Sequence, residues 1–252
     1  MAIDFDNGSS EGLYADTGSP LAYSFCVSAW WYLSLNNQTP LLVGTNNGSS
    51  NQSYRFYVKT DGAVCAGVAG GYSEVTATTS TTGSASTWHH AFASFESNTE
   101  RRVWLDGGGE NNQGSNRTPG AGNRIAIGYD GDGTPSTYGD GSIAEVATWE
   151  GTGSTFRSNT DLIVSLAKGV DPRFIRPDLL THYWRLLGPD HVDLIGGLNL
   201  TNVATPQVSA HCPIRYLAPP IISHTATPSI GHAGGLVNSQ RLRSKIGGVL
   251  AA

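Results

Sequence analysis

Short runs of alternating apolar and polar residues recur along this chain and constrain its fold more than any other feature. The clearest run, residues 22–35, alternates large apolar side chains with Ser, Cys and aromatic residues. A period of two places successive side chains on opposite faces of a β-strand, and turns rich in Gly, Asn, Asp and Ser separate the runs. Further strands are expected at residues 2–6, 41–45, 53–60, 63–69, 86–97, 101–107, 124–130 and 141–150. Many short strands at this spacing predict an all-β antiparallel sandwich.

The length and composition favour one large β domain. The chain has 252 residues, of which 32 are Gly and only 14% are charged. Helical spacing predicts one short helix at about residues 160–168, ended by Pro172. Strand-like runs at about residues 180–203 are expected to return to the sandwich, so we assign residues 1–204 to this domain.

The C-terminal sequence differs in texture and charge. From Thr205 it is rich in Pro, and residues 211–252 contain no Asp or Glu. Because such a segment buries little apolar area, we predict an extended arm over residues 205–252. The alternative is a solvated tail with incidental charge. The basic residues predicted to contact a partner are Arg215, Arg241, Arg243 and Lys245.

The cysteines and the N-terminal sequence bear on the compartment. Three cysteines without CxxC spacing predict reduced thiols and no zinc site. The first residues lack the basic and apolar regions of a signal peptide, and no apolar run approaches the ~18 residues of a membrane span. We expect synthesis in the cytoplasm and no membrane partner.

Several segments occur in the order typical of one known family. AIDFDNGSSEGLYADTGSP precedes SFCVSAWWYL, STWHHAFASF precedes RRVWLDGG, and IAIGYD precedes YGDGSIAEVATWEG. Together they resemble laminin-G-like domains of the concanavalin A-like lectin/glucanase superfamily. The resemblance covers roughly residues 1–204 and implies a jelly-roll sandwich, with DLIVSLAKG as its short terminal helix.

A second resemblance concerns the segment after the main strands. LAKGVDPRFIRPDLLTHYWRLLGPDHVDLIGGLNLT is similar to a variant of such domains in phage and prophage virion proteins. It implies a non-enzymatic structural virion protein of a bacteriophage, a capsid decoration or tail-associated subunit held by its C-terminal arm. The implied partners are other virion proteins and further copies of the chain. The alternatives are a carbohydrate-binding adhesin or lectin module and, more remotely, a glycoside hydrolase.

Glu145 and Glu150 raise the hydrolase alternative. Retaining hydrolysis needs two carboxyl groups about 5–5.5 Å apart. Positions five apart point to opposite faces of a regular strand, so a bulge would be required. Sandwich glucanases of the family resembled carry an aspartate between the two glutamates, and here Ala147 and Thr148 stand in that region. We therefore predict no catalytic residues and a structural role for Glu145.

His89 and His90 follow Trp88 in a predicted strand. Adjacent strand residues face opposite ways and cannot converge on one ion. We expect one histidine to be buried and the other exposed. The sequence also lacks nucleotide-binding, hydrolase-elbow, zinc-protease and specific nucleic-acid motifs.

Loop residues supply the candidate ligand sites. Sugar binding on such a fold would use exposed aromatic rings and loop amides. The candidates are Tyr72, Tyr129, Tyr138, Asn46 and Asn47.

Calcium is the one cofactor that the sequence leaves open. Asp130, Asp132 and Asp140 lie in the Gly-rich stretch YDGDGTPSTYGDG, and carboxylates at alternate positions suit Ca²⁺. The alternative, which we favour, is a turn whose Asp and Gly residues supply unusual dihedral angles.

Overall fold

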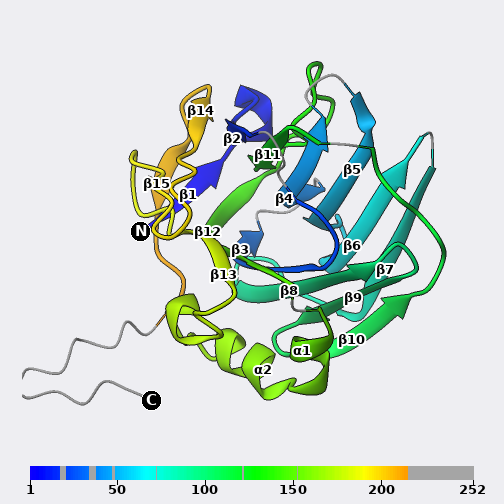
Figure 1. The fold of residues 1–252 in the computed structure, drawn as a ribbon. Coiled ribbons are helices and arrows are strands. Elements are labelled where there is room, and N and C mark those ends of the chain that lie inside the picture. The colour runs from blue at the N-terminus through cyan, green and yellow to red at the C-terminus, as the bar shows by residue number, and fades with distance from the viewer. Residues whose placement is uncertain are drawn as a thin grey trace, which may run out of the picture. The chain divides into compact units, whose positions relative to one another are not determined.

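A computed structural model shows two antiparallel sheets packed face to face (Figure 1). It describes residues 1–17, 21–33, 38–46, 49–71, 73–120, 122–151 and 153–214. The predicted all-β jelly-roll sandwich is therefore confirmed.

In the described part of the chain, the first sheet has eight strands. Seven are ordered β10-β9-β8-β3-β12-β1-β15, and β13 pairs with the second half of β12. The bounds are β1 Ala2–Phe5, β3 Phe25–Leu33, β8 Trp88–Ser97, β9 Glu100–Leu105, β10 Gly108–Gln113, β12 Gly141–Glu150, β13 Leu180–Trp184 and β15 Gln207–Ser209.

The second sheet has seven described strands, in the order β14-β2-β11-β4-β5-β6-β7. The bounds are β2 Gly12–Asp16, β4 Thr39–Asn46, β5 Ser49–Val58, β6 Ala63–Gly70, β7 Ser73–Thr82, β11 Arg124–Ile127 and β14 Thr201–Val203. The predicted Asp61-Gly62 turn joins β5 to β6, and Gly62 has a φ of 82° that suits glycine.

Period-two alternation explains the core. Phe25, Val27 and Trp31 of β3 are buried between the sheets, where they join apolar residues of the opposite sheet such as Phe56. The residues between them face the outer side of the eight-stranded sheet, as Trp30 does in a separate cluster. Each face of β3 therefore contacts a different layer.

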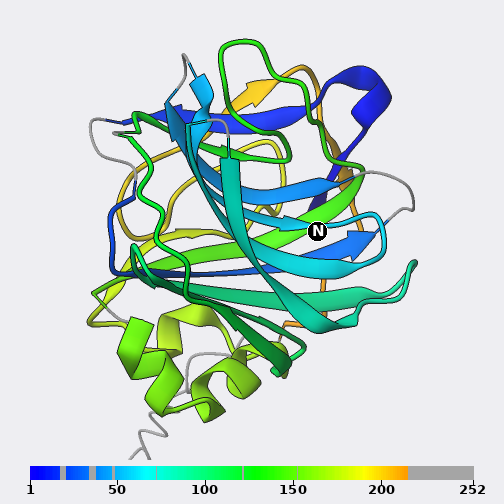
Figure 2. The same cartoon turned by 90° about the vertical axis from the view of Figure 1, so that its right-hand side faces the viewer.

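Helices cover one end of the outer face of the eight-stranded sheet. The helical elements are α1 Gly153–Ser158, α2 Asp161–Ala167 and the 3-10 turns η1 Asn7–Ser9 and η2 Pro172–Phe174. Helices α1 and α2 lie at one end of the sandwich (Figure 1). Phe156 of α1 and Leu166 of α2 pack with Phe92 and Trp149 of the sheet. Figure 2 shows the same yellow-green helices below the strands. The predicted helix corresponds to α2, whereas α1 was not predicted.

The compact unit continues beyond the predicted boundary at residue 204. Strand β15 pairs with β1, and Cys212 is buried in a cluster with Ala2, Trp30 and Ala144. The first ten residues assigned to an arm thus pack on the sandwich, because a strand pairing and a buried thiol hold them there. Residues 215–252 lie outside the described residues, including the basic positions Arg215, Arg241, Arg243 and Lys245.

All three cysteines are buried free thiols, as the sequence predicts. In the described ranges, every helix is too short and too polar to cross a bilayer.

Candidate functional site

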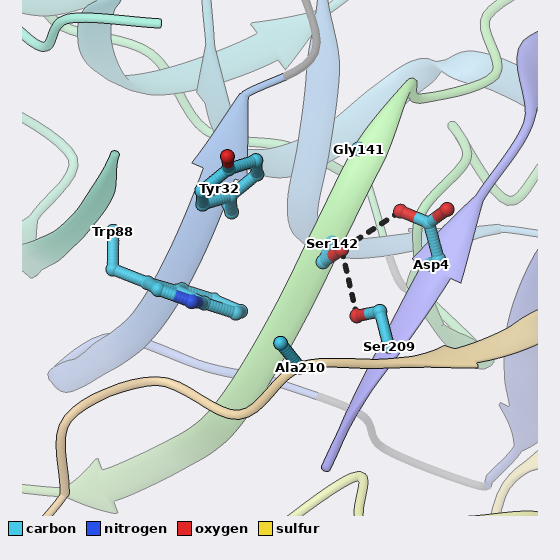
Figure 3. Close-up of a pocket in the computed structure, with 7 residues that line it drawn as sticks. All are labelled: Asp4, Tyr32, Trp88, Gly141, Ser142, Ser209 and Ala210. Atoms are coloured by element: carbon cyan, nitrogen blue, oxygen red, sulfur yellow. Dashed lines mark hydrogen bonds between the residues drawn. The ribbon is translucent and has the colours of Figure 1, made fainter. Parts of the chain in front are cut away.

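A surface pocket of about 390 Å³ lies on the outer face of the eight-stranded sheet (Figure 3). Five strands and the residue after β15 contribute to it. Its lining residues are Asp4, Tyr32, Trp88, Gly141, Ser142, Ser209 and Ala210.

One wall of this pocket is aromatic. Tyr32 of β3 and Trp88 of β8 are direct partners across the two strands, and both side chains are half-buried. Their neighbours Trp31 and His89 are buried on the core side, so alternation turns Tyr32 and Trp88 outward. The two rings lie 5.6 Å apart at 57°, and the Trp88 ring extends toward the floor of the pocket (Figure 3).

The opposite wall is polar. Ser142 of β12 pairs with Asp4 of β1, and its hydroxyl donates to Asp4 Oδ1 at 2.7 Å. The Ser209 hydroxyl of β15 donates to Ser142 Oγ at 2.8 Å (Figure 3). Asp4 is exposed, and the described lining residues include no Lys or Arg. The wall therefore presents a carboxylate and hydroxyl groups to solvent.

The segment 207–214 forms part of this pocket and packs beside its aromatic wall. Ala210 belongs to the lining, while Trp88 and Ile214 pack against the buried cluster that contains Cys212. The same segment thus forms part of the wall and supports the aromatic ring.

Two of the predicted sugar-binding residues, Tyr129 and Tyr138, lie on the outer face of the other sheet. Tyr138 lines a polar pocket of about 320 Å³. Tyr129 stacks against it, with ring centroids 5.9 Å apart, but is only 2% exposed and offers no surface to a ligand. Asn46 ends β4, and its side chain, like Tyr72 and Asn47, lies outside the described residues. The other residues lining the Tyr138 pocket are Asn7, Gln38, Ser136 and Thr137.

Two of the predicted calcium residues, Asp130 and Asp132, each use one carboxylate oxygen within their own loop. Asp130 is buried, and its Oδ2 accepts three hydrogen bonds of 3.2 Å from Ser136 and Thr137. Burial raises the pKa of Asp130. Asp132 Oδ1 accepts from the Thr134 amide at 2.8 Å. The backbone amide of Asp140 instead donates to Thr39 Oγ1.

A different set of potential metal ligands comes together in the described residues. One potential ligand atom from each of Glu145, His211 and Cys212 lies within 4.8 Å of the other two. Among the described residues, no other set of three Asp, Glu, His or Cys residues comes this close together. The aspartates of the loop therefore do not converge as a set of three. Arg185 Nε lies 3.9 Å from Glu145 Oε1, and this positive charge disfavours a cation.

Glu145 has protein partners that explain its burial. It is 0% exposed, accepts a hydrogen bond from the Tyr183 hydroxyl, and has His211 Nε2 2.8 Å from Oε1. The register of β12 shifts between Ala144 and Ala147, so the strand does contain a bulge. Even so, this carboxylate is enclosed, while Glu150 is exposed and lines a separate pocket with residues 22–24 and Gly151.

The prediction for the histidine pair is half wrong. His89 and His90 do face opposite ways, but both are buried, at 9% and 1% exposed. The reason is that the outer face of the sheet is covered as well as the core face. His89 Nδ1 lies 2.7 Å from Asp106 Oδ2, whereas the ring nitrogens of His90 have no hydrogen-bond partner among the described residues.

Sequence reasoning missed the pocket residues Asp4, Tyr32, Trp88, Ser142 and Ser209. The alternation in β3 and β8 carried the signal that Tyr32 and Trp88 point outward. The polar wall required knowledge of the pairing between β1, β12 and β15, which joins residues far apart in the sequence.

Comparison with known proteins assigns the family. A model of the concanavalin A-like lectin/glucanases superfamily, of the Laminin_G_3 type, matches residues 7–154, more than half of the chain. The chain belongs to this family. No curated protein sequence matches it.

Solved structures agree with this superfamily at the level of fold. A native heptameric SAP-like pentraxin from Limulus polyphemus aligns with a TM-score of 0.52 and 17% identity, covering 66% of this chain and 81% of the pentraxin. The CBM40 of the Ruminococcus gnavus IT-sialidase, bound to α2,3-sialyllactose, has a TM-score of 0.47 and 13% identity, with coverage of 59% and 89%. Tailspike protein 2 of Escherichia coli O157:H7 bacteriophage CAB120 has a TM-score of 0.49 and 12% identity, with coverage of 73% and 26%. At 17% identity the likeness to the pentraxin supports the fold alone, and the other two likenesses, with TM-scores below 0.5, support no conclusion about this chain.

Proposed function

We propose that this domain is a non-enzymatic carbohydrate-binding module whose ligand occupies the pocket between Trp88 and Asp4. The observation that carries the proposal is the pairing of an aromatic wall with a wall of carboxylate and hydroxyl groups in one open pocket. A sugar ring has an apolar face that packs on an aromatic ring and hydroxyl groups that need hydrogen-bond partners.

The geometry of the pocket suits one or two sugar rings better than a large apolar ligand. Its volume of about 390 Å³ falls in the lower range of small-molecule pockets. Asp4 is an acceptor for sugar hydroxyls, and the Ser209 oxygen can also accept, because its proton is donated to Ser142. The enclosed Glu145 leaves no exposed pair of glutamates beside this pocket, so binding without hydrolysis is the function that it supports.

Glycan-array screening followed by calorimetry tests the proposal. Trp88→Ala should weaken the affinity for any glycan found at least tenfold, equivalent to about 1.4 kcal/mol, while Trp88→Phe retains part of it. Tyr138→Ala is the matched control, because it removes an aromatic ring from the pocket on the opposite sheet. An affinity lost in Tyr138→Ala but kept in Trp88→Ala would assign binding to the other pocket, and an array without any ligand would refute the proposal.

A structural role in a bacteriophage virion is a second proposal, supported by the sequence after the sandwich. Residues 211–252 lack Asp and Glu but carry four basic residues, a charge pattern that suits attachment to an acidic protein surface. Since residues 207–214 belong to the folded unit, a truncation should follow Ile214. We expect the truncated protein to fold and keep its pocket but to lose its occupancy on particles. Unchanged occupancy would refute attachment through this segment.

A further inference from the structure

Arg101 is a fully buried arginine whose surroundings lack a negative charge. It lies on β9 opposite Phe95 of β8 and is 0% exposed. Its Nη2 donates to the carbonyl oxygens of Asn98 and Ser115, each at 3.0 Å. The Nε and Nη1 groups have no hydrogen-bond acceptor in the described structure. A buried guanidinium normally has a paired carboxylate, because removing an isolated charge from water is costly.

A second arginine approaches the first. The Arg117 backbone amide donates to Asn98 O at 2.7 Å, which is the same carbonyl oxygen that Arg101 contacts. The Nε of Arg117 is also buried without an acceptor. Burial lowers the pKa of the Arg101 guanidinium most, the Tyr23 hydroxyl beside it raises this pKa, and the positive charge of Arg117 lowers it further.

Aromatic residues and a crossing segment enclose this pair. The Tyr23 hydroxyl donates to Arg117 O at 2.7 Å, and the rings of Tyr23 and Tyr54 lie 5.1 Å apart. Residues 114–120 belong to the connection from β10 to β11, which passes from one sheet to the other (Figure 1). The acidic neighbour Glu100 is bonded to Arg102 and Arg157 instead.

We propose that a small monovalent anion of chloride size binds between the guanidinium groups of Arg101 and Arg117. Such an ion would accept from the three nitrogen atoms that lack an acceptor and offset the repulsion between two positive charges. Water could accept the same hydrogen bonds but would leave the repulsion in place. Because Arg101 has no exposed surface, a site at its guanidinium would be enclosed, which favours a small spherical ion over a sugar carboxylate or a sulfate.

Chloride-dependent stability of the whole chain tests the site. At constant ionic strength, replacing gluconate by chloride should raise the Tm of the wild-type protein with the logarithmic dependence of single-site binding. Arg101→Met should abolish this dependence, whatever the Tm of the variant itself. If Arg101→Met does not fold, Arg117→Met removes the second guanidinium from a half-buried position and should weaken the dependence.

A matched control and a direct observation complete the test. Arg124→Met removes a surface arginine that is bonded to Asp16, and it should keep the full chloride response. Crystals grown with bromide should show an anomalous peak between the two guanidinium groups. A peak without any Tm response would indicate an adventitious ion only, and an equal Tm response in Arg101→Met would show a general salt effect. Either result overturns the proposal.

Discussion

His211 Nε2 lies 2.8 Å from Glu145 Oε1, although 66 positions separate the two residues. This contact fastens the segment 207–214 to the middle of β12. Glu145 lies at the bulge of β12, where its φ of 55° departs from regular strand geometry. At this point its carboxylate contacts Tyr183 and His211. The contact therefore links the last described segment to the enclosed acid of the sheet.

We expect His211→Ala to destabilise the fold by about 2–4 kcal/mol, because it leaves a buried carboxylate with one fewer partner. Urea unfolding measures this free energy. Hydrogen exchange should show faster exchange at the β15 amides, since β15 lies at the edge of its sheet. Glycan affinity should fall too, because Ser209 and Ala210 line the pocket. Unchanged exchange at β15 would contradict the role of this contact.

Asp193 accepts the hydrogen bonds that hold the turn after β13, and we expect the free energy of unfolding to fall when Asp193 is protonated at low pH. Burial alone would raise the pKa of Asp193, but hydrogen bonds outweigh burial and lower the pKa to about 2. The donors are the His182 ring and the backbone amides of Tyr183, Ile195 and Leu198.

In the unfolded chain the pKa of this carboxyl is near 3.8, so its lower pKa in the folded protein stabilises the fold when the carboxyl is ionised. This stabilisation, about 2 kcal/mol, is present above pH 4 and is lost as the pH falls toward 2. Asp193→Asn should flatten this acid-dependent loss and should also destabilise the protein at pH 7, as measured by urea unfolding across pH. Asp178→Asn alters an exposed carboxylate paired with Arg176 and should change little. An unaltered acid profile in Asp193→Asn would refute the assignment.

This turn also shows how far the sequence can be interpreted. The DLIGG segment at residues 193–197 falls within the strand-like runs predicted at about 180–203, and its resemblance to other domains can be recognised without coordinates, but it forms a bend between β13 and β14. Its physical reason needs the fold. A Cβ on Gly196 would lie 2.5 Å from His182 Nδ1 and from Thr181 O, both on the paired strand. Sequence locates the glycine, whereas only the strand pairing explains why it must be glycine.

The pocket, too, could be predicted from the sequence only in part. The strands carrying Tyr32 and Trp88 follow from alternation, and so do the outward directions of these side chains. That Ser209 reaches Ser142 depends on β15 pairing with β1, in a region whose Pro-rich sequence predicts an extended arm. A strand of three residues leaves no periodic signal, so the polar wall could not be predicted.

His90 should make the protein less stable as the pH falls toward 4. Burial lowers the pKa of His90 to about 3, so the folded protein keeps the ring neutral where the unfolded chain, with a pKa near 6.5, takes up a proton. Stability should therefore decline by up to about 1.4 kcal/mol per pH unit between pH 6 and 4. His90→Phe keeps an aromatic ring beside Trp30 and removes two unpartnered nitrogens, so it should remove this decline.

Urea unfolding between pH 7 and pH 4 measures the effect, and the neighbouring histidine is the control. The hydrogen bond that His89 donates to the Asp106 carboxylate raises the pKa of His89, so the fold gains stability as the pH falls through this raised pKa toward 6.5, and the gain is constant below that pH. His89→Gln should therefore lose this gain above pH 6.5 and keep the decline between pH 6 and 4, which His90→Phe removes. If both variants had the same profile, the assignment of the two histidines would be wrong.

Calcium should leave the Tm of this domain unchanged, because Asp130 and Asp132 each already accept hydrogen bonds through one carboxylate oxygen. Asp130 Oδ2 holds the amides of Ser136 and Thr137, and Asp132 Oδ1 holds that of Thr134. Asp130→Ala removes the acceptor of three hydrogen bonds from Ser136 and Thr137 and should cost about 1–3 kcal/mol with or without the ion. Asp130→Asn retains an acceptor oxygen and should cost less. A saturable rise of Tm with Ca²⁺ that Asp130→Asn abolishes would instead establish a calcium site, because that variant removes the charge while keeping the shape of the loop.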